Sequence, residues 1–245
     1  MDCSLSGARS ICKRLIATAE TGDHFMSSLR KNRTGQTSGF SLLEMVMVLA
    51  LIITLATVSF MSLQPMLRQQ RVNNAYNTVL SAMRVARDYS VAQRTSYVVI
   101  MDSTTTPHSI RVQPTFVGPQ GIQKTVSYSL PTDVGFRVVA GIPTAPSKTP
   151  DGFGTGAKAI DFGYTNAGAG VGGSNLIYFC PDGTAQDAAG GVGQCTGNLN
   201  GGVVYIARAG ELLSSRAITV WGATGRMRGW RLYNGGAGGV IWQRQ

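Results

Sequence analysis

Residues Ser38–Phe60 read SGFSLLEMVMVLALIITLATVSF, an apolar stretch that carries a single carboxylate, Glu44. The run Met45–Leu63 contains 19 residues and no charge. As a helix rising ~1.5 Å per residue it would span roughly 28 Å, close to the ~30 Å hydrocarbon core of a bilayer. A charge at such depth is costly unless it has a partner or a function. The stretch therefore predicts one membrane-spanning helix whose carboxylate needs an explanation.

A basic segment precedes the apolar run, because residues Arg30–Arg33 read RKNR. Positive charge beside a span keeps that flank in the cytoplasm, so we expect the chain after Leu63 to lie outside it. A secretory signal peptide would have a shorter apolar region, followed by a cleavage site with small residues. Here the apolar run is longer and a glycine, Gly39, lies just ahead of it. The pattern favours a retained anchor over a secretory signal.

The residues around this glycine resemble a known family. Gly39-Phe40-Ser41-Leu42-Leu43-Glu44, followed by the apolar run, resembles the prepilin signature of type IV pilins and type II secretion pseudopilins. The resemblance implies that a prepilin peptidase cuts between Gly39 and Phe40 and N-methylates Phe40, which makes Glu44 the fifth mature residue. It also implies a filament subunit that starts in the bacterial inner membrane with a periplasmic C-terminal domain. Its partners would be the peptidase and other pilins or pseudopilins.

Cleavage would place an ammonium on Phe40, near Glu44. In a filament, the carboxylate of one subunit can meet the amine of its neighbour, which pairs two buried charges and sets the axial register. The alternative is a glutamate at an ordinary transmembrane helix end, held near the lipid headgroups. The neighbouring residues favour the filament role.

The implied leader is residues 1–39. Translation from Met26 would shorten it to MSSLRKNRTGQTSG, 14 residues with three basic ones, which is typical of the class. We expect the start at Met26, with a longer leader as the alternative.

Charge and composition describe the remainder of the chain. Residues 1–39 hold six basic and three acidic residues, so seven of the ten net positive charges belong to residues 40–245. A basic remainder leaves a polyanionic partner open. The 31 glycines and the low charged fraction of 14% suit a β-rich, loop-rich domain better than a helical bundle.

The helix is expected to continue past Pro65 to about Arg94, with Pro65 causing a kink rather than an end. Apolar residues recur at steps of three and four, which predicts an amphipathic helix over residues 65–95. The stripe comprises Val72, Tyr76, Val79, Met83, Ala86 and Ser90. Five arginines lie mostly off the stripe and are expected to form a solvated face: Arg68, Arg71, Arg84, Arg87 and Arg94.

Residues 96–245 show short β-like runs between turn residues. The runs are YVVIM, SIRVQ, TVSYSL, VGFRVVA, AIDFGY, NLIYFC, VVYIA and ITVW. They predict an α+β fold in which a long N-terminal helix, transmembrane in its first half (residues 40–64), packs against an antiparallel β-sheet head. The stretch GIPTAPSKTPDGFGTG (residues 141–156) is expected to be an exposed, mobile loop.

Three stretches resemble the GspH/FimT branch of minor pilins. LSAMRVARDYSVAQ (residues 80–93) resembles its helix end, YFCPDGTA (residues 178–185) its strand and turn, and ITVWGATGRMRGWRL (residues 218–232) its closing hairpin with a G-R-x-R element. In FimT-like members of natural transformation systems this element is associated with DNA binding. GspH-like members of type II secretion systems have a similar head without that role. The resemblance thus implies either DNA uptake or contact with exported proteins.

The closing hairpin carries a basic cluster. Arg226, Arg228 and Trp230 alternate, so an extended strand would point all three to one face. Guanidiniums can grip phosphates and an indole can stack on a base, and Arg231 adds charge nearby. No carboxylate follows Glu211, so the arginines are expected to lack local acidic partners. The alternative is an edge strand kept soluble by charge, with Trp230 in the core; the residues alone leave both open.

Cys180 and Cys195 remain after the leader is removed. An extracytoplasmic location permits oxidation, so a disulfide is favoured. The alternative is a metal site, for which two sulfurs and a lone mature histidine, His108, are a poor ligand set. No motif supplies a nucleophile with a base, a phosphate-binding lysine loop or a placeable carboxylate pair. We therefore predict no catalytic residue, no metal and no cofactor.

Overall fold

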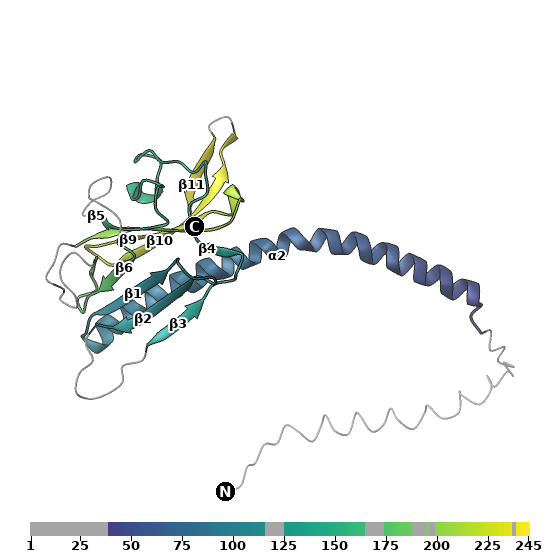
Figure 1. Cartoon of the computed structure of the whole chain (residues 1–245), viewed down its shortest axis with the longest axis horizontal. Helices are drawn as coiled ribbons and strands as arrows, with labels where there is room; N and C mark the ends of the chain where they lie inside the picture. The colour runs from purple at the N-terminus through teal and green to yellow at the C-terminus, as the bar shows by residue number, and fades with distance from the viewer. Residues whose placement is uncertain (1–38, 116–124, 165–173, 188–194, 196–198, 237–238) are drawn as a thin grey trace, which may run out of the picture. The chain divides into compact units, whose positions relative to one another are not determined.

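The computed structural model describes residues 39–115, 125–164, 174–187, 195, 199–236 and 239–245 (Figure 1). The expected leader, including the alternative start at Met26, lies outside these residues except for Gly39. The chain divides into two compact units, residues 1–57 and residues 58–245.

The first unit is described from Gly39 to Thr57 and consists of the start of helix α2 (Leu42–Gln93). The carbonyl oxygen of Ser41 accepts the backbone N–H groups of Glu44 and Met45, at 2.9 and 3.1 Å. Glu44 lies in the first turn, where the helix dipole favours a carboxylate. Within the described ranges, α2 is the one helix long and apolar enough to cross a membrane, and none of its most apolar window is buried. The expected membrane segment is therefore present as an exposed apolar helix.

The second unit begins inside α2. The helix continues through Pro65 to Gln93, so the proline does not end it. One stripe of this part is buried: Val72, Ala75, Tyr76, Val79, Ala82, Met83 and Ala86. Its small residues let strands approach the helix closely, and the stripe forms part of the main core.

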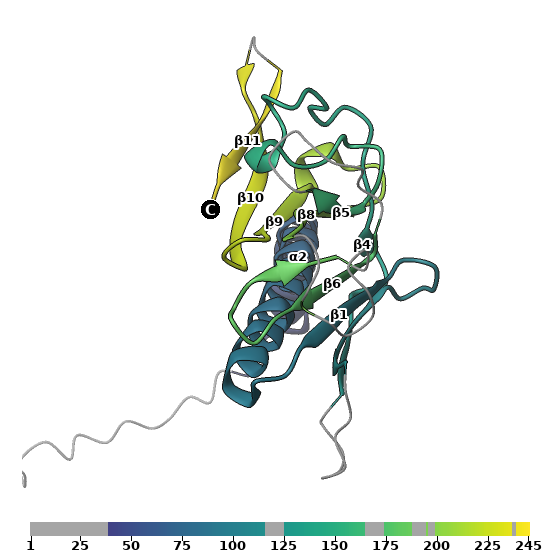
Figure 2. The same cartoon turned by 90° about the vertical axis from the view of Figure 1, so that its left-hand side faces the viewer.

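Two antiparallel sheets cover this stripe (Figures 1 and 2). The first runs in the order β3 (Val126–Ser129), β2 (Ser109–Pro114), β1 (Tyr97–Asp102), β6 (Leu176–Phe179) and β7 (Ala185–Gln186). The second runs β11 (Val240–Arg244), β10 (Arg226–Asn234), β9 (Arg216–Trp221), β8 (Gly201–Arg208) and β4 (Val134–Phe136), and β5 (Ile160–Tyr164) also pairs with β8. The predicted α+β fold, a long helix with an antiparallel head, is confirmed.

The second sheet has a core on each face. One face meets α2, and the other carries a separate cluster that includes Phe153, Tyr205 and Leu232. Phe153 belongs to the stretch 141–156, is 1% exposed and lies 5.0 Å, ring centre to ring centre, from Trp221. The prediction of an exposed loop is therefore wrong for Thr149, Pro150 and Phe153, which are buried, whereas residues 144–148 are exposed as expected. Turn-forming residues place the chain in an irregular conformation, but its interspersed apolar side chains still bury themselves on the sheet.

The cysteine pair lies at the end of β6, since Cys180 directly follows the last residue of that strand. Cys180 and Cys195 form a disulfide, so no free thiolates remain there for the alternative metal site. The carbonyl oxygen of Cys180 accepts the Ser90 hydroxyl at 3.0 Å, which ties this end of β6 to α2. In the following turn, Asp182 accepts the hydroxyl and backbone N–H of Thr184, and these hydrogen bonds lower the pKa of Asp182. Asp182 is thus a turn residue.

Candidate functional sites

The first candidate site is the start of α2. Phe40 is 75% exposed, Leu42 is 82% exposed, and Glu44 is exposed in the same turn. A Cβ atom built on Gly39 would meet nothing within 4 Å, so packing in this structure does not require glycine there. The site therefore consists of an apolar side chain, a carboxylate and an unobstructed glycine at the end of an uncovered apolar helix.

The second candidate site is the hairpin of β9 and β10. Arg226 lies opposite Trp221, Arg228 opposite Thr219, and Trp230 opposite Ala217. Directly opposed residues share one face of an antiparallel pair. The register thus places the three alternating residues of β10 on one face, as the alternation predicts.

Arg228 is not free on that face. Its Nη1 lies 2.7 Å from Oδ1 of Asp151, whose side chain is only 6% exposed. The same carboxylate accepts the Thr219 hydroxyl at 2.5 Å and the Trp221 indole N–H at 3.1 Å. Arg228 has no local acidic partner, as expected, but it has a distant one, because Asp151 comes from 77 residues earlier in the chain. The Asp151 carboxylate thus accepts hydrogen bonds from three side chains of the hairpin.

Asp151 sits in a strained turn. It belongs to the 3₁₀ turn η1 (Pro150–Gly152) and has a φ of +52°, which a non-glycine residue seldom adopts. The same turn leads into Phe153, which is buried under the sheet. The stretch 141–156 therefore serves to present one carboxylate to the β9–β10 hairpin.

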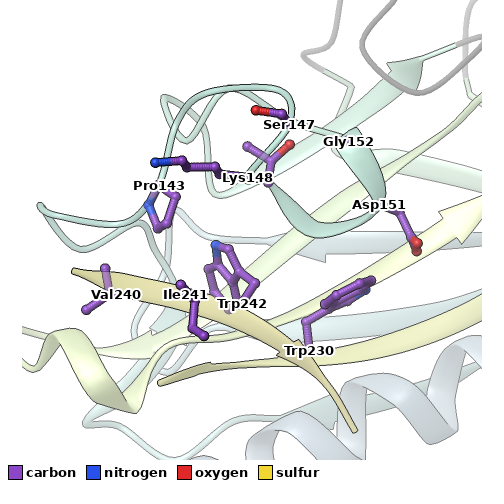
Figure 3. Close-up of a pocket in the computed structure, with 10 residues that line it drawn as sticks. Pro143, Ser147, Lys148, Asp151, Gly152, Trp230, Val240, Ile241 and Trp242 are labelled. Carbon is purple, nitrogen blue, oxygen red and sulfur yellow. The ribbon is translucent and has the colours of Figure 1, made fainter. Parts of the chain in front are cut away.

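Trp230 lies in the wall of a groove beside this turn (Figure 3). The groove encloses about 440 Å³ between the turn and strands β10 and β11. The indole N–H of Trp230 donates to the Thr219 hydroxyl at 3.2 Å, and the side chain is half-buried. Trp242 and Lys148 line the same groove. Trp230 is thus neither a free stacking platform nor a fully buried core residue.

Arg231 points to the opposite face of the sheet, toward α2. It lies opposite Arg216, and its guanidinium carbon is 5.0 Å from the centre of the Tyr233 ring. Arg216 is 1% exposed, and burial, reinforced by the nearby charge of Arg231, lowers the pKa of Arg216 to about 10. The guanidinium of Arg216 therefore remains charged at neutral pH. Arg231 does not join the other three hairpin residues.

Arg226 lies at a third candidate site, a groove between α2 and the β9–β10 hairpin. It lines an open groove of about 500 Å³ together with Arg84, Arg87 and Asp88 of α2. Arg87 is held in place, because its Nε and Nη2 donate to the backbone oxygens of Gly183 and Thr224, at 3.3 and 3.2 Å. Arg84 and Arg87 are two of the arginines expected on the solvated face of the helix. Their spacing of three residues on a helix was the signal that both could serve one site.

No protein-family model, curated protein or solved structure matches this chain. Within the part of the chain that the structure describes, no group of three or more His, Cys, Asp or Glu side chains could hold a metal ion. The fold defines the class as an α+β protein with one long apolar N-terminal helix, an antiparallel head and a disulfide. This arrangement is compatible with a pilin-like fold.

Proposed function

We propose that this chain is a pilin-like filament subunit, a minor pilin or pseudopilin, anchored in the bacterial inner membrane before assembly. The observation that carries the proposal is the start of α2, where exposed apolar side chains surround one carboxylate. The resemblance of residues Gly39–Glu44 to the prepilin signature assigns that carboxylate a partner, the amine of a cleaved neighbour.

The exposed apolar side chains at the start of α2 must be shielded from water. Leu43, Ile53 and Phe60 are 71%, 61% and 72% exposed. Removing each such side chain from water contributes ~1.5–3 kcal/mol. Before assembly, lipid packs against these side chains. In a filament, the helices of neighbouring subunits pack against them. A helix with apolar residues on all sides and one acid at its start suits both surroundings.

The unobstructed position of Gly39 makes cleavage testable without disturbing the fold. Mass spectrometry of the native protein is expected to find a chain that begins at Phe40 and carries one added methyl group. Gly39→Val is expected to keep the leader, because a branched side chain at the cut site would hinder the peptidase, while thermal unfolding of the head stays unchanged. A wild-type protein that still carries residues before Phe40 would contradict the proposal.

A second candidate function is DNA binding during uptake, favoured by the groove of Arg84, Arg87 and Arg226. Three guanidiniums around an open groove can contact successive phosphates, which gives binding without sequence preference and with strong salt dependence. The alternative within the same filament class is a GspH-like pseudopilin that contacts exported proteins and does not bind DNA.

Arg226→Ala tests the DNA candidate. Each lost phosphate contact lowers the salt dependence of binding, so we expect the slope of log affinity against log salt to fall by about one. The measurement is a gel shift with duplex DNA over a salt series. Arg111→Ala, an exposed arginine of β2, is the matched control. Equal binding by wild type and Arg226→Ala would remove the DNA candidate and favour the pseudopilin.

A further inference from the structure

A small cavity lies beside the part of α2 that follows the apolar run. It encloses about 210 Å³ between the helix from Pro65 to Val72 and the chain around Leu213 and β10. Three of its lining side chains are guanidiniums: Arg68 from the helix, Arg216 from β9 and Arg231 from β10. All of these residues belong to the second unit of the chain. The cavity lies on the α2 side of the β9–β10 hairpin, on the face opposite to Arg226, Arg228 and Trp230.

The positive charge of this cavity is poorly compensated. Arg216 and Arg231 lie directly opposite each other on adjacent strands, where like charges repel. Arg216 donates to the backbone oxygens of Ser214 and Ser215, each at 3.2 Å, and to the Asn73 side chain at 3.1 Å. Those partners are neutral, and in the described ranges Arg216 has no ion pair and its Nε has no hydrogen-bond partner.

One carboxylate, Glu211, also lines the cavity. It lies 3.4 Å from Arg208, outside the cavity, so its charge is already shared. Three guanidiniums therefore face one engaged carboxylate. An anion entering the cavity would relieve the repulsion between Arg216 and Arg231 and would contact the exposed Arg68 at the mouth.

The surroundings indicate where that anion comes from. Leu63, Met66 and Leu67 are 54%, 59% and 52% exposed, and Leu213 in the cavity wall is 48% exposed. Exposed apolar and basic side chains thus occur together around the cavity. Long basic side chains beside apolar ones are typical of the membrane interface, where the aliphatic stem lies against lipid and the charge reaches the headgroups.

The spacing along the helix agrees with this position. Arg68 follows Leu63, the last residue of the predicted membrane-spanning run, by five residues, and it is the first charged residue after Glu44. Five residues of helix rise ~7.5 Å, and the headgroup layer on each side of the hydrocarbon core is about 5–7 Å thick. When the apolar run fills the hydrocarbon core, the backbone of Arg68 lies at the outer edge of the headgroup layer, and its long side chain can reach back to the phosphates.

We propose that this cavity binds the phosphate of a membrane phospholipid. Arg68 and Arg231 contact the phosphate oxygens, and the buried Arg216 contributes its charge from the floor of the cavity. Guanidinium forks match phosphate oxygens geometrically. The inference rests on the membrane-anchored state of the proposed function, before the subunit enters a filament.

Native mass spectrometry of the mature full chain, released from detergent with added phosphatidylglycerol, tests the proposal. Wild type is expected to retain one phosphatidylglycerol. Arg68→Ala with Arg231→Ala is expected to bind it about 25-fold more weakly, roughly fivefold for each arginine lost. Arg84→Ala with Arg226→Ala is the matched control, because it removes the same charge from a different groove. Arg68→Glu, on an exposed helix face, repeats the test with the strands untouched.

The outcomes separate the sources of the anion. Retention by wild type and control but not by the Arg68 variants supports the proposal. Equal losses in both double variants would show diffuse attraction and overturn it. Displacement of the lipid by equimolar inorganic phosphate would assign the cavity to free phosphate and overturn the lipid source.

A last comparison separates this inference from the filament function. If the Arg68 variants bound lipid as wild type does but entered filaments poorly, the cavity would take a carboxylate of a neighbouring subunit, and the lipid proposal would be overturned. If lipid retention followed Arg68 and Arg231 in a chain that is never cut at Gly39, the cavity assignment would stand and the filament function would fall.

Discussion

Glu44→Ala is expected to leave the chain cut and inserted in the membrane yet to exclude it from filaments. Removing one partner of a buried charge pair leaves the other charge uncompensated, at a cost of about 3–5 kcal/mol. The expected loss of incorporation is therefore more than about a hundredfold. The amount of the subunit in sheared filaments, relative to the membrane fraction, measures it by immunoblot.

Two variants make the Glu44 result specific. Glu44→Gln keeps the size of the side chain and removes its charge, so it should fail as Glu44→Ala does. Thr54→Ala changes another exposed polar side chain of α2, whose hydroxyl donates to the Leu51 backbone oxygen at 2.9 Å, and should incorporate normally. Normal incorporation of Glu44→Ala would show that the carboxylate does not set the register.

Asp151→Ala is expected to destabilise the head strongly. It removes the acceptor shared by Arg228, Thr219 and Trp221, and it leaves a guanidinium without its only ion pair among the described residues. Breaking such a pair from one side costs about 3–5 kcal/mol when both groups are buried; we expect about 3 kcal/mol because Arg228 is partly exposed. Urea unfolding of the mature chain in detergent, followed by tryptophan fluorescence, measures the change.

Asp88→Ala is the matched control for Asp151→Ala. Asp88 is an exposed carboxylate of α2, so its removal should change the free energy of unfolding by no more than about 0.5 kcal/mol. Similar small changes in both variants would contradict the structural role of Asp151.

The ion pair between Arg228 and Asp151 also affects the DNA experiment, because Arg228→Ala would weaken the hairpin itself. Arg226, which is exposed, is the variant that separates binding from folding.

Several features could be predicted from the sequence because neighbouring residues determine them. The uncharged run after Glu44 specifies a helix long enough for a membrane, and the three- and four-residue spacing from Val72 specifies the buried stripe. The alternation of Arg226, Arg228 and Trp230 specifies their common face. Periodicity reports which side of an element is buried, and it needs no knowledge of the partner.

Other features could not be predicted, since they depend on how distant segments meet. Asp151 reaches Arg228 across 77 residues, from a stretch whose proline and glycine content indicates only a loop. Arg216 carries the same charge as Arg226, yet one is buried and the other exposed. Composition could not distinguish them, because burial of a guanidinium requires acceptors that only the packed chain supplies, here the backbone oxygens before β9 and Asn73 of α2.

The sequence by itself determined the exposed apolar helix, its lone acid, the strand-rich head and the cysteine pair favoured as a disulfide, since each follows from local pattern or from chemistry. The tertiary structure alone decided which arginines are free, which are paired and which share a cavity. The physical reason is that charge is a property of a residue, whereas its compensation is a property of whatever the fold places beside it.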